Sequence, residues 1–353
     1  MLFQLTGERL MASNGGSSAE TIYKEDREEK KEVNKNGKAA ATCACSSSRA
    51  EDVRAGLVDT FLNLERVEAN LFLGRHLLKG RKSLTTVYGG QVIGQALSAA
   101  TKTVDEALVP HSLHSYFLEM GDVNRPILYM VDKIRDGKSF STRIVKAVQD
   151  GKAIFSTQIS FHKLEPDAMV HQHEMPKVTP PEELEDVRPL IENALKEKKL
   201  PPVSKALLSY KIKDIPAPFD RVFQFRPVNQ ENFLLKNEKA EPKSYFWLKA
   251  KEKIGDDAQL NYSIAAFISD STMIETALMP HCSRGFVPSM VFSLDHCIWL
   301  HKPNFRVDEW MLYENYSPVA GGSRGFIQGR LWTRDGQLVM STTQEGLFRA
   351  AQK

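Results

Sequence analysis

The sequence has few of the features that mark membrane, metal-binding and nucleic-acid-binding proteins. It contains no uninterrupted apolar run of about 18 residues, so no transmembrane span is expected. It has only 4 cysteines, and no C-x-x-C motif pairs with another, which argues against a zinc site and favours free, reduced thiols in an intracellular protein. The net charge is only +3 and the basic residues are scattered, so no nucleic-acid partner is expected.

The rest of the composition is that of an ordinary folded protein with an extended N-terminus. Hydrophobic residues make up 42% of the chain, enough for substantial cores. Residues 1–52 are rich in Lys, Glu and Asn and then in Ala, Cys and Ser; they predict a disordered extension because they can bury little apolar area. Residues 166–210 are broken by several prolines and predict a linker, within which residues 181–199 are predicted to be a charged helical stretch. The stretches 53–165 and 211–350 are predicted to be two domains.

Each predicted domain combines one helix with several antiparallel strands, the pattern of a helix wrapped by a curled sheet. Gly89-Gly90 precede a helix at 91–101, and a second helix is expected near 258–270, both with apolar residues at helical spacing. Alternating apolar and polar residues predict strands at 111–119, 126–135, 139–149 and 152–162, and then at 220–226, 243–251, 289–300, 309–316, 324–333 and 337–348.

Three short patterns recur in the same order in the two halves, which indicates a duplicated unit and hence two similar domains. Chance similarity between two β-rich halves is the alternative. The patterns are H-S-Y-F-L at His114–Leu118 and H-C-I-W-L at His296–Leu300 (182 residues apart), Leu128-Tyr129 and Leu312-Tyr313 (184 apart), and Asp150-Gly151 and Asp335-Gly336 (185 apart).

Two residues of the second half could take part in hydrolysis. Asp270 ends the second predicted helix on the flank of its apolar stripe, where partial desolvation could prepare a carboxylate to act as a base. A solvated Asp at a helix end is the alternative. Ser293 is expected on one strand face with Val291, Asp295 and Cys297, and a purely structural serine is the alternative.

Gln344 is the third candidate, on a strand face with Thr342. Its amide offers a donor and an acceptor that could orient a water, although an exposed strand amide is the alternative. The repeat offsets map Ser293 onto His111 and Gln344 onto Ile159. The first half therefore lacks the set of three, and one active centre built mainly on the second half is expected.

A G-x-S-x-G motif occurs at Gly321–Gly325, but its context argues against a nucleophile elbow. That motif needs a strand before it and a helix after it, whereas residues 326–333 predict a strand. It also needs a later histidine, and His301 is the last one in the chain. The glycines are therefore predicted to form a turn, with Arg324 free to bind an anion.

Four longer stretches of the sequence, taken together, are similar to one known protein family. They are Y-G-G-Q-V-I-G-Q-A-L at Tyr88–Leu97, H-S-L-H-S-Y-F at His111–Phe117, S-L-D-H at Ser293–His296 and T-Q-E-G at Thr343–Gly346. Together they resemble the acyl-CoA thioesterase II family, in order and with the family's spacing over about residues 55–349. Residues 175–185 and 321–332 are especially similar to animal peroxisomal members.

The resemblance implies a fold and an activity. The fold is α+β, a double hotdog in which two helices are each wrapped by antiparallel sheet and the two sheets join into one layer. The activity is hydrolysis of fatty acyl-CoA to free fatty acid and CoA, without a metal or redox cofactor. A hotdog hydratase or dehydratase acting on acyl-CoA and a non-catalytic acyl-CoA binder are the alternatives, and a homo-oligomer is left open.

The resemblance also assigns roles to residues. In the family a carboxylate, a hydroxyl and a glutamine act together on one water. The matching positions are Asp270, Ser293 and Gln344. Asp270 would be the general base, and the other two would hold the water. The backbone N–H groups of Gly89 and Gly90 are candidates for binding the oxyanion. His111 matches a histidine sometimes proposed as catalytic in relatives, and it ranks second because the duplication places it opposite Ser293.

The expected compartment follows from the same resemblance. Peroxisomal relatives typically end in an S-K-L-type signal, whereas this sequence ends in Ala350-Ala351-Gln352-Lys353. The peroxisomal matrix is therefore implied by resemblance, and the cytosol is the alternative.

Overall fold

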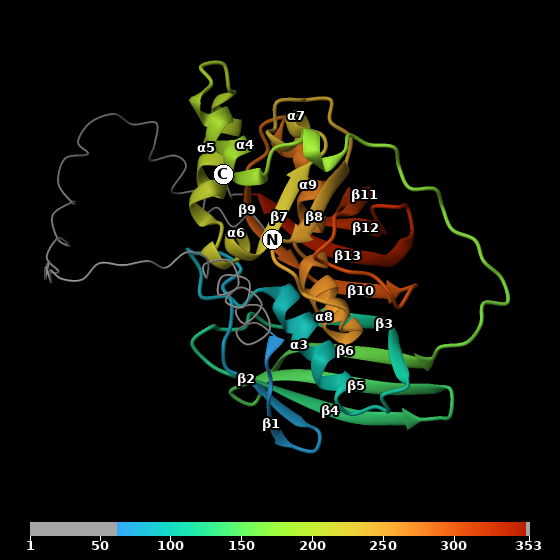
Figure 1. Ribbon diagram of the computed structural model, residues 1–353. Helices are drawn as coiled ribbons and strands as arrows, with labels where there is room; N and C mark the ends of the chain where they lie inside the picture. Colours follow the sequence, from blue (N-terminus) through green and yellow to red (C-terminus); the bar gives the residue numbers. More distant parts are fainter. Residues whose placement is uncertain (1–61, 351–353) are drawn as a thin grey trace, which may run out of the picture.

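A single curved sheet of thirteen antiparallel strands forms the centre of the computed structural model, which describes residues 62–350 (Figure 1). The predicted disordered extension, residues 1–52, lies outside the described residues. The strands follow the order β1-β2-β4-β5-β6-β3-β10-β13-β12-β11-β8-β7, and β9 pairs with β13. Their bounds are β1 (Glu65–Glu68), β2 (Leu71–Gly74), β3 (Leu108–Phe117), β4 (Ile127–Asp136), β5 (Phe140–Gln149), β6 (Lys152–Lys163), β7 (Phe223–Pro227), β8 (Lys243–Ala250), β9 (Pro288–Ser293), β10 (Asp295–Leu300), β11 (Met311–Gly321), β12 (Arg324–Thr333) and β13 (Leu338–Ala350).

The two halves of the sheet are built alike and meet at its middle. Counting outward from the centre, the first half runs β3, β6, β5, β4, β2 and the second half runs β10, β13, β12, β11, β8. The central strands β3 and β10 pair antiparallel, with His114 opposite Cys297. This order relates the halves by an approximate twofold axis and confirms the double hotdog with its sheets joined into one layer. The division into domains at residues 165 and 210 stays a prediction.

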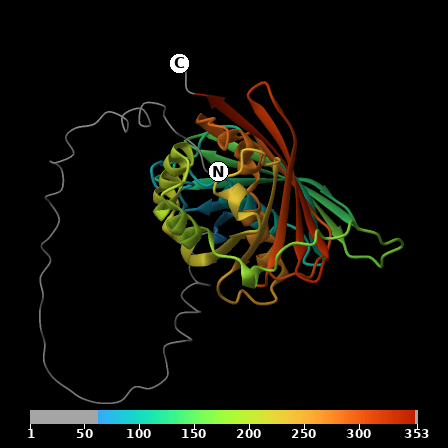
Figure 2. The ribbon, with the colours of Figure 1, turned by 90° about the horizontal axis from the view of Figure 1, so that it is seen from above.

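One long helix from each half lies in the hollow of the sheet, at the positions that the sequence predicts (Figures 1 and 2). They are α3 (Gly89–Thr101) and α8 (Ala258–Ser269), and both are buried on nearly all sides because the sheet curls around them. A further helix, α9 (Met273–Cys282), follows α8 after a short turn. The sequence does not reveal α9, because nearly all of its residues are buried, so no polar face alternates with an apolar one, and Pro280 lies inside it.

Two glycines of α3 let the central helices approach each other closely. A Cβ atom at Gly90 would lie 2.2 Å from the carbonyl oxygen of Phe267 in α8, and one at Gly94 would lie 2.9 Å from that of Ser263. The Tyr88 hydroxyl donates a hydrogen bond to the same Phe267 oxygen (2.9 Å). Backbone therefore packs on backbone at this crossing, and any side chain in place of the glycines would push the helices apart.

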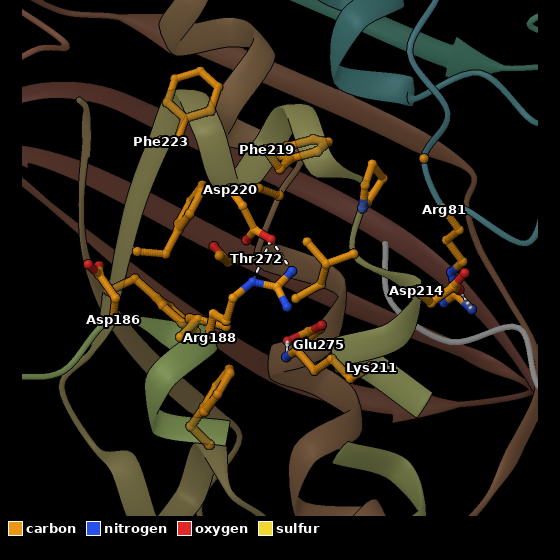
Figure 3. A pocket seen from close by; sticks show the side chains of 18 of the residues that line it. Arg81, Asp186, Arg188, Lys211, Asp214, Phe219, Asp220, Phe223, Thr272 and Glu275 are labelled. Carbon is orange, nitrogen blue, oxygen red and sulfur yellow. Dashed lines mark hydrogen bonds and ion pairs between the residues drawn. The ribbon is translucent and has the colours of Figure 1, made fainter. Parts of the chain in front are cut away.

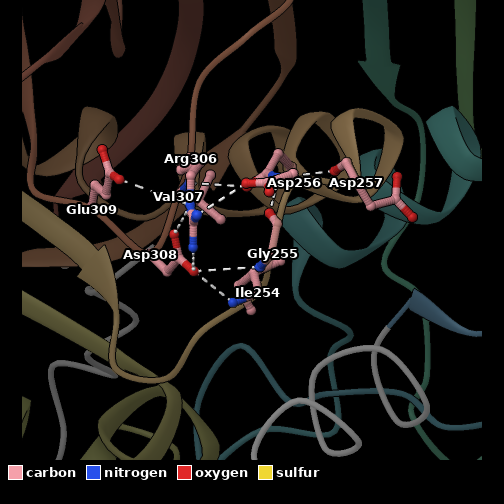
Figure 4. A network of polar contacts seen from close by, with 9 residues as sticks. Ile254, Gly255, Asp256, Asp257, Arg306, Val307, Asp308 and Glu309 are labelled. Atoms are coloured by element: carbon pink, nitrogen blue, oxygen red, sulfur yellow. Dashed lines mark hydrogen bonds and ion pairs between the residues drawn. The ribbon is translucent and has the colours of Figure 1, made fainter.

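A charged network fixes the start of α8 (Figure 4). Asp308, in the segment between β10 and β11, accepts hydrogen bonds from the backbone N–H of Ile254 (2.7 Å) and from Arg306 (2.8 Å). The adjacent Val307 donates its N–H to the Asn261 side chain in α8 (3.0 Å). The Asp257 side chain caps the helix by accepting from the Leu260 N–H (3.1 Å). With its start held in this way, α8 ends at a defined place in the core.

The segment between β6 and β7 is partly helical, although the sequence predicts a linker over most of it. It runs as coil past the β12–β13 turn, where Gln172 donates to the carbonyl oxygen of Gly336 (2.7 Å). It then forms a short 3₁₀ turn and the three helices α4 (Val187–Lys196), α5 (Pro202–Asp214) and α6 (Ala217–Val222). We call these three the inserted helices; they lie on the second half of the molecule, beside β7 and α9 (Figure 1). Every helix within residues 62–350 is too short or too polar to span a bilayer.

Two of the three repeated patterns occupy equivalent places. Tyr129 in β4 and Tyr313 in β11 both reach inward, to Gln95 of α3 (2.7 Å) and to the carbonyl oxygen of Ser269 in α8 (3.0 Å). Gly151 and Gly336 both turn a hairpin with positive φ, the conformation that favours glycine.

The third repeated pattern is not a structural equivalence. His114 is exposed on the outer face of β3, whereas His296 is fully buried against α8. A shift of one residue moves a strand side chain to the other face of the sheet. An offset of 183 between the halves matches the buried His296 to the buried Leu113, whereas an offset of 182 matches it to the exposed His114. The mapping of Ser293 onto His111, which used 182, falls with it.

Replacement of Gly90 by alanine tests the helix contact. The added Cβ would overlap the Phe267 carbonyl oxygen, so we expect Gly90→Ala to lower the free energy of unfolding by about 1–3 kcal/mol or more, measured by urea denaturation. Gly321→Ala is the matched control, because nothing lies within 4 Å of a Cβ at that position, and it should change stability by less than about 0.5 kcal/mol. Equal effects of the two substitutions would contradict the tight crossing.

Candidate active site

The three residues singled out in the second half meet at one point. Asp270 follows the last residue of α8 and is 1% exposed, Ser293 ends β9, and Gln344 lies in β13 with no exposed surface. The Gln344 side-chain nitrogen donates to Asp270 Oδ1 (2.7 Å) and to Ser293 Oγ (2.7 Å). Ser293 Oγ and Asp270 Oδ1 are 3.4 Å apart. One amide therefore joins a carboxylate and a hydroxyl at the end of α8.

A break between β9 and β10 places Ser293 on the inner face. Both strands pair with β13, but Leu294 interrupts them and donates its N–H to the Glu345 carbonyl oxygen (2.8 Å). The break shifts the alternation by one residue, so Ser293 and His296 both face the helices. The expectation that Ser293 shares a face with Asp295 and Cys297 is therefore wrong, because it assumed one unbroken strand from 289 to 300.

A mostly apolar cavity of about 300 Å³ opens beside Asp270 and Ser293. Both halves of the molecule contribute to its walls, since β3 and α3 supply one side and α9 and β9 the other. Gln344 does not line the cavity and holds the other two residues from behind. Apolar lining residues include Val92, Phe117, Ile154, Phe155, Ile274 and Val291.

The start of α3 faces the carboxylate across this cavity. A Cβ atom at Gly89 would lie 2.8 Å from Asp270 Oδ2, so the backbone of the first helical turn approaches that oxygen directly. No side chain caps α3, and its first turn contains no acidic residue. The first N–H groups of a helix lack intrahelical acceptors and carry partial positive charge, so this helix end stabilises an anion at Asp270.

Behind Asp270 lies a buried histidine that the sequence analysis did not single out. His296 Nε2 is 2.9 Å from Ser269 Oγ, and that hydroxyl donates to the Ala266 carbonyl oxygen (2.9 Å). Because the hydroxyl hydrogen is used in this way, the imidazole donates its Nε2–H to the serine oxygen. Burial lowers the pKa of His296 to about 4, so the ring is neutral. In the sequence, His296 appeared only as the first residue of the H-C-I-W-L repeat and the last residue of the S-L-D-H stretch, with no role assigned to it.

Residues 79–162 match the family model described as the acyl-CoA thioesterase N-terminal domain, and residues 218–347 match the model described as acyl-CoA thioesterase. The human acyl-coenzyme A thioesterase 8 is 46% identical over 84% of this chain and 90% of its own length. The chain belongs to the acyl-CoA thioesterase II family.

Other relatives agree with this assignment. The peroxisomal acyl-coenzyme A thioester hydrolase 1 of Saccharomyces cerevisiae is 26% identical over 82% of this chain and 93% of its own. The crystal structure of an acyl-CoA thioesterase II from Mycobacterium marinum superposes with a TM-score of 0.64 at 32% identity, covering 83% of this chain and 97% of that one. The protein is thus a thioester hydrolase of acyl-CoA with a double hotdog fold.

The remaining candidate residues of this thioesterase lie outside the cavity beside Asp270, except Gly89, which lines it. Gly90 packs against α8. His111 Nε2 is 2.8 Å from Ser160 Oγ on the face of the sheet away from the helices, and burial lowers its pKa. Arg324 is not free, because it forms an ion pair with Glu345 (2.9 Å). In the described part of the chain, no three His, Cys, Asp or Glu side chains gather so as to hold a metal ion.

The buried histidine predicts a pH dependence of stability. An unfolded imidazole has a pKa of about 6.5, above the folded value, so the unfolded chain takes up the proton first as the pH falls. The contribution of the neutral His296 to the free energy of unfolding is fully present above about pH 6.5. It is lost as the pH falls towards 4, by up to about 1.4 kcal/mol per pH unit. We expect His296→Gln, which keeps an N–H donor, to flatten the decline of the unfolding free energy between about pH 6.5 and 4.5.

The control for this experiment is His301→Gln. The His301 ring belongs to an exposed residue and is hydrogen-bonded to Ser341 Oγ (2.8 Å). Partial burial of the ring lowers its pKa in the same direction as that of His296 but by less. Its substitution should leave most of the slope in place, and if both substitutions change the slope equally, the decline does not originate at His296.

Proposed function

We propose that this thioesterase hydrolyses fatty acyl-CoA with a water that Asp270 deprotonates and that Ser293 and Gln344 hold. The observation that carries the proposal is the single amide nitrogen 2.7 Å from both Asp270 Oδ1 and Ser293 Oγ, beside an apolar cavity. At 3.4 Å the direct contact between Ser293 and Asp270 is long for an O–H···O hydrogen bond. The hydroxyl is therefore available to a water next to the carboxylate.

The reaction needs little beyond positioning and proton transfer. The water attacks the thioester carbonyl carbon while Asp270 takes its proton. The carbonyl oxygen becomes an oxyanion, and the N–H groups of Gly89 and Gly90 at the start of α3 are its candidate donors. When the C–S bond breaks, the CoA thiolate leaves and takes up the proton that Asp270 accepted. Free fatty acid and CoA are the products, and no metal or redox step is required.

Incubation of the purified protein with palmitoyl-CoA and a thiol reagent tests the reaction itself. Release of one thiol per acyl-CoA consumed is the expected result. An altered acyl chain without free thiol would instead indicate a hydratase or dehydratase, and binding without turnover would indicate a silent acyl-CoA binder.

Substitution of the three residues tests their roles. Asp270→Asn keeps the shape of the side chain but removes the base, so we expect kcat to fall by about 10²–10⁴-fold, the usual contribution of a general base. Ser293→Ala and Gln344→Ala should lower kcat more than they raise KM, because they act on the water and not on acyl-CoA. Steady-state kinetics with thiol detection measures all three.

His111→Ala is the matched control for this series. It removes a half-buried polar side chain of the same sheet outside the cavity, and turnover should stay near that of the unmodified protein. If Asp270→Asn keeps near-full turnover while His111→Ala abolishes it, the catalyst lies in the first half and the proposal is wrong.

The name of the yeast relative supports the peroxisomal matrix as the compartment of this protein as well. The cytosol is the alternative, and fluorescence imaging of the native chain against a peroxisomal marker separates the two. Self-association into a homo-oligomer is a further proposal, which sedimentation of the purified protein tests.

A further inference from the structure

A second cavity of about 250 Å³ lies next to the catalytic one (Figure 3). Its walls come from the inserted helices, from β7 and β8, and from the α8–α9 turn. Gly80 and Arg81 line both cavities. Much of the wall is apolar, and its aromatic side chains are Tyr88, Phe219, Phe223, Phe225, Phe233 and Phe246.

The two cavities lie on either side of the place where α3 begins and α8 ends. Gly89 and Asp270 line the catalytic cavity, whereas their chain neighbours Tyr88 and Ser271 line the second one. Along α9, Ile274 faces the first cavity and Glu275 the second. When the thioester carbonyl of acyl-CoA lies at Asp270, the acyl chain on one side of the carbonyl and the CoA group on the other can therefore occupy different cavities.

The second cavity contains buried polar atoms that the protein leaves without hydrogen bonds. Lys211 of α5 donates to Glu275 Oε2 (2.7 Å), and their side chains are only 7% and 5% exposed. Glu275 Oε1 and Ser271 Oγ have no hydrogen-bond partner within residues 62–350; Asp214 Oδ2 has none either, although Arg81 Nη1 forms an ion pair with it at 3.8 Å. Buried polar atoms without partners destabilise a fold, so such a group in a cavity wall calls for a partner supplied by a ligand.

The chemistry of these atoms identifies the kind of ligand. The carboxylate oxygens of Glu275 and Asp214 can only accept, so they require N–H or O–H donors. Lys211 and Ser271 carry donors, which require carbonyl oxygens. Secondary amides supply both, and the apolar walls suit methylene and methyl groups between them. A plain fatty acyl chain would satisfy none of the polar atoms and fits the catalytic cavity better.

We propose that the second cavity binds the pantetheine arm of CoA, whose two secondary amides and hydroxyl are held by Glu275, Lys211, Asp214 and Ser271. The inserted helices then form the CoA-binding side of the enzyme, and the acyl chain occupies the apolar catalytic cavity. The proposal rests on the proposed function, because it requires the thioester carbonyl to lie at Asp270.

Exchange of the buried ion pair for two apolar residues tests the proposal. Lys211→Met combined with Glu275→Leu removes the amide partners without leaving an unpaired buried charge, a replacement that proteins often tolerate. Each variant is assayed with octanoyl-CoA and with the octanoyl thioester of 2-mercaptoethanol, which has the same acyl chain and no amide. We expect KM for octanoyl-CoA to rise about 10-fold or more with little change in kcat, and kcat/KM for the mercaptoethanol thioester to stay unchanged.

Two further variants keep the test decisive. Arg334→Met combined with Glu182→Leu replaces an exposed ion pair (2.6 Å) that lines neither cavity and should change neither substrate's kinetics. Ser271→Ala leaves the Lys211–Glu275 pair in place; if the double variant does not fold, as judged by thermal unfolding, the same selective rise in KM for octanoyl-CoA is expected from Ser271→Ala alone.

Two results would overturn the proposal. Equal losses with both substrates would mean that the cavity supports the fold and does not bind the amides. A loss that grows from butyryl-CoA to palmitoyl-CoA would place the acyl chain in this cavity. Failure of the proposed function is distinct from both, since it would appear as full activity of Asp270→Asn on either thioester.

Discussion

The crossing of α3 and α8 without intervening side chains is the contact on which the rest of the site depends. Gly90 and Gly94 let backbone lie against backbone, and the start of one helix reaches the end of the other. As a result, Gly89 touches the carboxylate of Asp270, although the two residues belong to different halves of the chain. A wider crossing would separate the positive helix end from the anion that it stabilises and would open the catalytic cavity to water.

The central pairing of β3 with β10 supplies the second constraint. It joins the two halves into one sheet, and a twofold arrangement of this kind could in principle carry two equivalent sites. In the described chain, Asp270, Ser293 and Gln344 have no equivalent set in the first half. At the position equivalent to Gln344 in β13, the first half has Ile159 in β6, which is equally buried and offers no hydrogen bond. The interruption at Leu294 has a counterpart in β3, where the register shifts between Pro110 and Ser112, but the offset of 183 places Pro110, which has no hydroxyl, at the position equivalent to Ser293.

Features that depend on local alternation and turn chemistry could be predicted from the sequence, and features that depend on register could not. Both central helices, the hairpin glycines and the strands from β3 onward follow from periodicity, except that β9 and β10 were expected as one strand; the short strands β1 and β2 were not predicted. Asp270, Ser293 and Gln344 were found as separate candidates, but no local pattern shows that one amide joins them. A single-residue interruption at Leu294 reversed the face expected for Asp295. His296, which is hydrogen-bonded to Ser269 next to Asp270, was not predicted as part of the site, because the alternation of apolar and polar residues in a strand does not identify a polar residue that is fully buried.

Burial keeps three titratable groups around Asp270 in their neutral forms at neutral pH. Burial raises the pKa of Tyr88 and of Tyr313 and lowers that of His296, so all three stay neutral there. Arg81, the cation on the cavity wall, lies 3.8 Å from Asp214 and is paired with it. Asp270 is held by one amide and faced by a helix start, and the three buried neighbours carry no charge; this arrangement suits the proposed role of Asp270 as a general base, because none of the three competes for the proton of a water.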